Sequence, residues 1–264
     1  MVGGIDPNPK HAGRGIEILR RAGIEVTVGV EQARCAELNE AFFQWIRFGR
    51  PFVLLKLAMT LDGRIATAGG DSKWITSAPA RRRVQRFRQW ADAIMVGAET
   101  VRLDDPELTV RTPQNWPRQP LRIVWSRRKD WPRHFRIWRA PGPPPLVAAP
   151  ATPQQWRDFL RRLGREHAVT ALLIEGGGEL AAAALRAGVV DKAAFFFAPK
   201  ILGGRRSRPG IAGPDPVRLD DAIRLRDSRC ERVGPDYLVI GRPARPEETD
   251  GNPGPAPAEP KGSQ

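Results

Sequence analysis

The run FVLLKLAM, residues 52–59, constrains the fold more than any other stretch of the chain. It is rich in branched apolar side chains and is followed closely by the turn-forming pair Asp62-Gly63. Such a run is typical of a strand covered on both faces, as in the middle of an α/β sheet. Its single charge, Lys56, is costly there, because an unpaired buried ion is strongly unfavourable. Lys56 therefore either has a permanent partner or lies where the strand opens into a site.

Short apolar runs continue to alternate with amphipathic segments as far as residue 243. The predicted strands are 52–59, 93–97, 121–125, 145–149, 170–175, 193–198 and 236–241, and the predicted helices are 78–91, 153–164 and 179–187. Strands separated by helices favour an α/β sandwich with a largely parallel sheet. The proline-rich stretch 140–155 predicts a surface loop around a short strand.

The two ends of the chain differ from this central part. Residues 1–48 predict a loop, a helix, a short strand at 24–30 and a second helix at 33–49. Residues 244–264 are rich in Pro, Gly and charge, which predicts a disordered tail.

Composition narrows the function classes. Apolar residues make up 41% of the chain, enough for a core, and no run is long enough to span a membrane. No secretory signal is recognisable, and Cys35 and Cys230 make no disulfide framework, so a cytoplasmic protein is expected. The net charge of +14 comes mainly from arginines spread along the chain. That spread favours arginine-rich composition and phosphate-bearing small ligands over nucleic-acid binding, which stays open as an alternative.

The stretch 71–90 predicts a helix capped by Ser77, with Pro79 in its first turn. Arg81 and Arg88 are seven residues apart on this helix and could hold a phosphate together. The alternative, which the pattern alone favours, is a solvated arginine face.

The stretch 96–111 follows a predicted strand. Thr100 can cap a short turn, and Arg111 offers an anion contact. Asp104 and Asp105 could orient sugar hydroxyls or assist proton transfer, or they are ordinary turn formers before a proline.

The stretch 171–191 runs from an apolar strand ending in Glu175, through Gly176, Gly177 and Gly178, into an alanine-rich helix. Glycines at such a turn let a phosphate approach the helix N-terminus, where N–H donors favour anions. A tight turn without a ligand is the alternative. The three histidines and two cysteines have no metal-ligand spacing, so no metal site is expected.

Six stretches taken together resemble the reductase half of the bifunctional riboflavin-biosynthesis deaminase–reductase family. They are RPFVLLKLAMTLDGRIA, SKWITS, the helix pattern AR…VQ.FR, GAETVRLDDPELTVR, IEGGGELA and APKILGG, in the family's order over residues 49–241. The resemblance implies a dihydrofolate-reductase-like three-layer α/β sandwich for residues 49–243 and NADPH as hydride donor. The implied reaction reduces 5-amino-6-(5-phosphoribosylamino)uracil to 5-amino-6-(5-phosphoribitylamino)uracil.

Carried over by position, the resemblance assigns roles to individual residues. It implies cofactor contacts from Ala58, Trp74, Thr100, Asp104, Ser126, Gly177, Gly178 and Glu179. It implies substrate contacts from Ser72, Arg88, Leu108, Arg111 and Glu175, with the arginines on the phosphate. Lys56 would polarise the open-chain carbonyl or imine or supply a proton, beside Asp104 as a second catalytic residue; the alternative is a structural Lys56–Asp pair.

The chain departs from the family at its start. It has neither the H-x-E nor the P-C-x-x-C signature of the family's zinc deaminase, yet residues 6–43 resemble the end of that domain. Residues 1–48 are therefore expected to be a deaminase remnant without zinc or deaminase activity. A separate deaminase or a longer parent protein would supply that step.

The resemblance also suggests a homodimer. The competing hypotheses are a related NADPH reductase of a pterin or other pyrimidine, and a non-catalytic basic nucleic-acid-binding protein.

Overall fold

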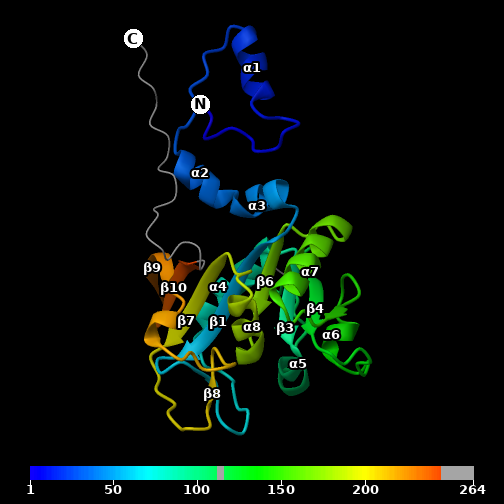
Figure 1. Ribbon diagram of the computed structural model, residues 1–264, viewed down its shortest axis with the longest axis vertical. Coiled ribbons are helices and arrows are strands. Elements are labelled where there is room, and N and C mark those ends of the chain that lie inside the picture. The colour runs from blue at the N-terminus through cyan, green and yellow to red at the C-terminus, as the bar shows by residue number, and fades with distance from the viewer. Residues whose placement is uncertain (112–115, 245–264) are drawn as a thin grey trace.

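An eight-stranded sheet forms the centre of the computed structural model, which describes residues 1–111 and 116–244 (Figure 1). Its order is β5-β4-β3-β6-β1-β7-β10-β9. The strands are β1 (Phe52–Thr60), β3 (Ala93–Gly97), β4 (Leu121–Trp125), β5 (Leu146–Ala148), β6 (Ala171–Glu175), β7 (Lys192–Ala198), β9 (Leu225–Val233) and β10 (Asp236–Pro243). All pairings from β5 to β7 are parallel, whereas β10 is antiparallel to both neighbours. The largely parallel sheet is confirmed.

Helices cover both faces of this sheet. On one face α7 (Pro153–Glu166) and α8 (Gly178–Arg186) pack Leu160 and Leu180 against Leu55 of β1. On the other, α4 (Ala78–Trp90), α5 (Ala98–Asp104) and α6 (Arg136–Arg139) share a cluster with Leu54 and Leu173. Helix, sheet and helix give the three layers that the strand–helix alternation predicts.

Helix α7 shows how the sequence sets this packing. Thr152 and Gln155 form a capping box at its start, and the buried positions Trp156, Phe159, Leu160 and Leu163 follow at helical spacing. At its end a Cβ on Gly164 would lie 2.6 Å from the carbonyl oxygen of Gly49. Only glycine lets the chain entering β1 pass so close.

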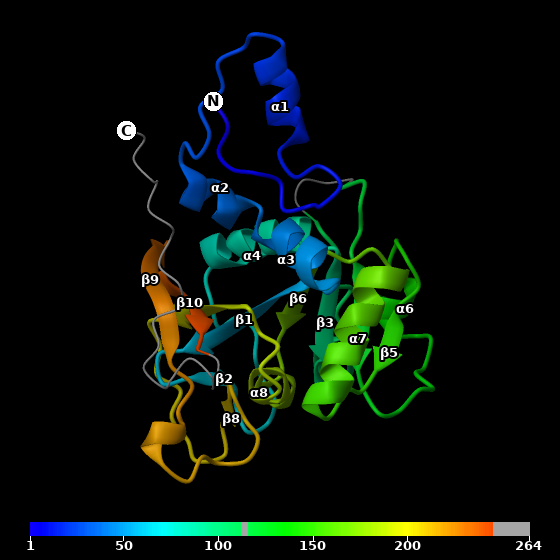
Figure 2. The same cartoon turned by 45° about the horizontal axis from the view of Figure 1, so that its top comes forward.

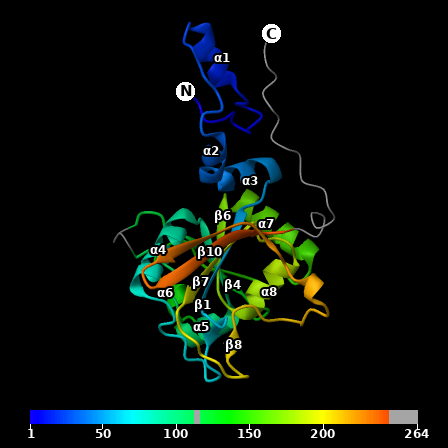
Figure 3. The ribbon, with the colours of Figure 1, turned by 90° about the vertical axis from the view of Figure 1, so that its left-hand side faces the viewer.

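Residues 1–48 lie beyond the amino ends of the parallel strands (Figures 1, 2 and 3). This N-terminal segment contains α1 (Arg14–Arg21), α2 (Gln32–Leu38) and α3 (Glu40–Phe48). Helix α1 buries none of its side chains, whereas α3 packs on β1 and its Trp45 donates to the Gly164 carbonyl at 3.1 Å. Helices α2 and α3 therefore attach the segment to the sheet.

Several local predictions are wrong. Residues 24–30 form no strand and contribute only an isolated bridge between Val28 and Val2, and the helix predicted at 33–49 divides in two at Asn39. The Ser77 hydroxyl precedes α4 but donates to Asp236 at 2.5 Å, so it does not cap the helix. Thr100 lies inside α5, whose N-cap is Gly97.

Other elements were not predicted. Strand β9 is exposed along most of its length and carries charged residues at most positions, so it lacks an apolar signal. The short strands β2 (Arg64–Ala66) and β8 (Arg208–Pro209) pair in a small second sheet, and a 3-10 turn covers Leu219–Asp221. The tail predicted to be disordered lies almost wholly outside the described residues.

Candidate active site

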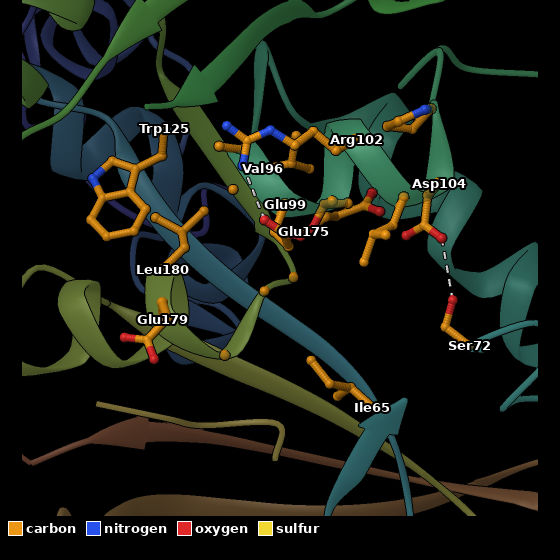
Figure 4. A pocket seen from close by; sticks show the side chains of 18 of the residues that line it. Ile65, Ser72, Val96, Glu99, Arg102, Asp104, Trp125, Glu175, Glu179 and Leu180 are labelled. Atoms are coloured by element: carbon orange, nitrogen blue, oxygen red, sulfur yellow. Dashed lines mark hydrogen bonds and ion pairs between the residues drawn. The ribbon is translucent and has the colours of Figure 1, made fainter. Parts of the chain in front are cut away.

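A cavity of about 960 Å³ opens at the carboxyl ends of β1, β3, β4 and β6. This is the edge at which open α/β sheets bind ligands. It lies at the end of the sheet away from the N-terminal segment, bounded by α5 and the β2–β8 sheet (Figure 1). In Figure 4 Ser72 and Asp104 lie on one side of it, and Trp125 and Leu180 on the other.

Lys56 enters this cavity from β1. In an otherwise buried strand only Lys56 and Ala58 are partly exposed, and both line the cavity. Lys56 lies in register with Glu175, the last residue of β6. Because side chains alternate along strands, both point to the face that α4 covers. Of the two alternatives that the sequence leaves for Lys56, the structure favours the second, because β1 opens into the cavity at this residue.

Glu175 is paired with Arg88 of α4. Arg88 donates to both carboxylate oxygens, at 2.7 and 2.9 Å, and to the carbonyl of Thr109 at 3.0 Å. The side chains are only 11% and 9% exposed, so this is a buried bidentate pair. Burial alone would raise the pKa of Glu175, but the charge and hydrogen bonds of Arg88 hold it below its usual value.

The Lys56 ammonium has no such contact. Across residues 1–111 and 116–244 it makes no hydrogen bond and no ion pair within 4 Å, and its counter-charge is Glu175 rather than an aspartate. Burial lowers the pKa of Lys56, and the nearby charge of Glu175 opposes that shift only in part. Lys56 therefore presents to the cavity an amino group that has no partner among the described residues.

The glycine turn has two separate structural roles. Gly176 and Gly177 have φ values of 95° and 89°, and a Cβ on Gly176 would meet nothing within 4 Å. Gly178 is different, because a Cβ there would lie 2.7 Å from the carbonyl oxygen of Pro209. The first two glycines shape an open turn before α8, whose N-terminus has no side-chain cap. Gly178 instead lets the backbone around β8 pack closely against the start of α8.

The opposite wall comes from α5. Asp104 ends this helix and accepts a hydrogen bond from Ser72 at 3.2 Å, with the ammonium of Lys73 3.8 Å away. Asp105 also lines the cavity, and its carboxylate accepts a hydrogen bond from the backbone N–H of Arg136 at 2.7 Å, which holds the start of α6.

The cavity brings together every residue that the resemblance assigns to the site. Arg81 is not among the lining residues, and its guanidinium stacks on Trp74, so the idea that Arg81 and Arg88 hold one phosphate is wrong. Sequence reasoning missed several further lining residues: Ile65, Trp125, Arg102, Arg127, Arg128, Arg136, Arg208, Pro209 and Ala212. The clustered arginines in the stretches 126–139 and 204–210 could have indicated some of them.

In the part of the chain that the structure describes, no three His, Cys, Asp or Glu side chains gather where they could hold a metal ion. Nor does that part contain a helix long and apolar enough to cross a membrane.

Comparison with known proteins places the chain among riboflavin-biosynthesis enzymes. The riboflavin biosynthesis protein RibD of Synechocystis is 40% identical over 266 residues, covering 91% of this chain and 70% of that protein. The structure of Acinetobacter baumannii RibD matches with a TM-score of 0.80 at 31% identity, over 92% of this chain and 72% of that one.

A third relative is described by its chemistry. The Thermotoga maritima diaminohydroxyphosphoribosylaminopyrimidine deaminase/5-amino-6-(5-phosphoribosylamino)uracil reductase matches with a TM-score of 0.77 at 31% identity, over 92% of this chain and 71% of that one. Residues 51–239 match the RibD C-terminal domain family. The chain therefore belongs to the RibD C-terminal domain family.

Proposed function

We propose that the chain is the 5-amino-6-(5-phosphoribosylamino)uracil reductase of riboflavin biosynthesis and that NADPH is its hydride donor. The observation that carries this is Lys56, a partly buried lysine without a partner among the described residues, beside a buried Arg88–Glu175 pair at the strand edge where ligands bind. Pockets for single small ligands span roughly 300–1,000 Å³, and the cavity of about 960 Å³ lies near the top of that range. It has the size expected of a site that holds a cofactor and a substrate together.

The cofactor fits the side of the cavity formed by α8 and the end of β4. The turn at Gly176 and Gly177 and the N-terminus of α8, which has no side-chain cap, suit a diphosphate, because backbone N–H groups at a helix N-terminus favour anions. Ala58, Trp74, Thr100, Asp104, Ser126, Gly178 and Glu179 would make the remaining contacts. When bound, NADPH would supply the hydride.

The substrate fits between α4, α5 and the loop that follows α5. Arg111 is exposed at the cavity and suits the substrate phosphate, whereas Arg88 already holds Glu175. The fixed Glu175 carboxylate can accept hydrogen bonds from substrate hydroxyl or N–H groups, and Ser72 and Leu108 complete that wall. When protonated at Nζ, Lys56 would polarise the carbonyl or imine of the opened ribose or protonate it.

NADPH oxidation monitored at 340 nm tests this function. The purified chain is expected to turn over NADPH with 5-amino-6-(5-phosphoribosylamino)uracil and to yield the ribityl product by mass spectrometry. Dihydrofolate and the dephosphorylated nucleoside are the controls. Turnover of dihydrofolate without turnover of the ribosylaminouracil phosphate would contradict the proposal and favour a pterin reductase.

We further propose that residues 1–48 are the end of a deaminase-like domain. The family match starts only at residue 51, whereas the Synechocystis relative aligns over 91% of the chain. No ammonia release from the 2,5-diaminopyrimidine precursor is expected, with or without added zinc.

We also propose a cytoplasmic homodimer. Light scattering on the purified chain would test its oligomeric state.

A further inference from the structure

The indole of Trp74 lies unusually open in the cavity wall. It is 63% exposed and lines the cavity, although tryptophan is a highly buried residue on average. Its loop joins β2 to α4. A flat aromatic side chain left uncovered in a ligand cavity suits a flat partner, because offset-stacked rings attract one another.

One face of this indole is already occupied. The guanidinium carbon of Arg81 lies 4.4 Å from the ring centroid, and an Arg81 nitrogen donates to the carbonyl of Thr76 at 2.7 Å. Trp74 lines the cavity and Arg81 does not. Arg81 therefore supports the ring from behind and leaves its other face toward the cavity.

The backbone of Trp74 is held from the other side of the molecule. The ammonium of Lys200, in the loop after β7, donates to the Trp74 carbonyl at 2.9 Å. That loop is fixed in turn, because Leu61 donates to the Lys200 carbonyl at 2.7 Å.

Asp62, in the turn after β1, strengthens the same anchor. Its carboxylate accepts from the backbone N–H groups of Leu202 and Gly203 at 3.0 and 2.8 Å. The Thr60 hydroxyl and these two N–H groups lower the pKa of Asp62 to about 2, so it is ionised at neutral pH. The stretch APKILGG, which carried no function by sequence alone, thus ties the end of β1 to the Trp74 loop.

We propose that Arg81 and Lys200 are positioning residues that hold the Trp74 indole as a platform for a planar heteroaromatic ring. The inference rests on the proposed function, under which that ring is either the nicotinamide of the cofactor or the pyrimidine of the substrate. Arg81 fixes the tilt of the indole and Lys200 fixes the backbone that carries it.

The test compares Arg81→Ala, Arg81→Lys and Lys200→Met with the wild type. Arg82→Ala is the matched control, because Arg82 is an exposed arginine on the same helix. The readouts are the Kd for NADPH from its fluorescence, the KM and kcat of turnover, and acrylamide quenching of Trp74 in the unliganded protein. The Trp74 signal is the difference between each protein and the same protein carrying Trp74→Phe.

The expected result has three parts. Arg81→Ala increases quenching of Trp74, because both ring faces become accessible. It also weakens binding of one ligand about two- to fivefold, the range for a single exposed cation–π contact, while kcat stays unchanged. Arg81→Lys keeps most of the wild-type affinity and quenching. Lys200→Met weakens binding of the same ligand, and Arg82→Ala changes neither affinity nor quenching.

The same measurements show which ligand supplies the ring, and they distinguish failure of the platform from failure of the proposed function. A rise confined to the Kd of NADPH places a ring of the cofactor on the indole, and a rise confined to the KM of the pyrimidine places the substrate there. Either result supports the platform. Unchanged quenching and unchanged affinity for both ligands in Arg81→Ala would overturn it. If the wild type binds NADPH without reducing the pyrimidine, the proposed function fails, while quenching and NADPH affinity still decide the platform.

Discussion

Two clusters of charge lie at opposite ends of the same sheet and are built differently. The cavity cluster consists of Lys56, Arg88 and Glu175. The edge cluster joins the N-terminal segment to the sheet and consists of Glu37, Glu40, Lys192, Arg229 and Arg242. In the edge cluster each cation touches a carboxylate, at 2.6 Å for Lys192–Glu40, 2.9 Å for Arg229–Glu37 and 2.6 Å for Arg242–Glu40. In the cavity cluster Arg88 binds both oxygens of Glu175, and Lys56 makes no hydrogen bond or ion pair with any residue that the structure describes.

The difference separates a structural arrangement from a functional one. A paired cation recovers part of its lost hydration from its partner, whereas an unpaired one does not. The edge cluster therefore stabilises the docking of α2 and α3. The cavity cluster leaves the Lys56 amino group without a partner among the described residues, at the expense of stability. Such an arrangement is reasonable only where a ligand uses this group.

Replacing the lysine of each cluster should give opposite results, and the largest effect is expected in the cavity. Lys56→Met should lower turnover by about 10²- to 10⁴-fold, the usual contribution of a general acid, and leave the fold intact or slightly more stable. Lys192→Met, its matched control, should keep turnover and lose stability. Steady-state kinetics and urea unfolding on both variants check this. Equal turnover of Lys56→Met and wild type would make Lys56 structural.

Removing the buried carboxylate should cause the largest loss of stability. Glu175→Gln leaves Arg88 and Lys56 together without a counter-charge, so unfolding should become easier by about 3–5 kcal/mol. The denaturation midpoint should fall at unchanged m-value. A loss below about 1 kcal/mol would mean that the Arg88–Glu175 pair is not the buried unit described above.

The edge cluster should respond more weakly. Glu40→Gln breaks partly buried contacts to Lys192 and Arg242, which predicts a loss of about 1 kcal/mol and a more protease-sensitive N-terminal segment. Turnover should not change, because the cluster lies away from the cavity. Limited proteolysis with mass spectrometry measures the release, and Glu17→Gln on α1 is a suitable control. A large fall in turnover would show that the two clusters are coupled.

The sequence predicted the parts of the fold that local patterns determine. Apolar runs identified the buried strands, and helical spacing identified α4, α7 and α8. Strand β9 was not predicted, because most of its side chains are exposed and it has no apolar run. The strand predicted at 24–30 failed because alternation alone does not supply a partner strand.

The sequence and the resemblance named residues that lie around one cavity, but they did not show how these residues contact one another. No sequence pattern could show that Arg88 would pair with Glu175 and leave Lys56 uncommitted, because those three residues lie on different elements. For the same reason Arg81 was interpreted as solvated, whereas tertiary packing stacks it on Trp74.

The measurement that tests the central claim most directly is the pKa of Lys56 set against the pH dependence of kcat. The chain has only seven lysines, so ¹³C NMR of lysine-labelled protein, assigned with Lys56→Met, can follow Lys56 alone. Burial lowers this pKa, so the protonated form should be lost below the ordinary value of about 10.4 as the pH rises. The account predicts that kcat falls with the same apparent pKa that NMR gives for Lys56. A kcat that stays constant while Lys56 loses its proton would contradict it.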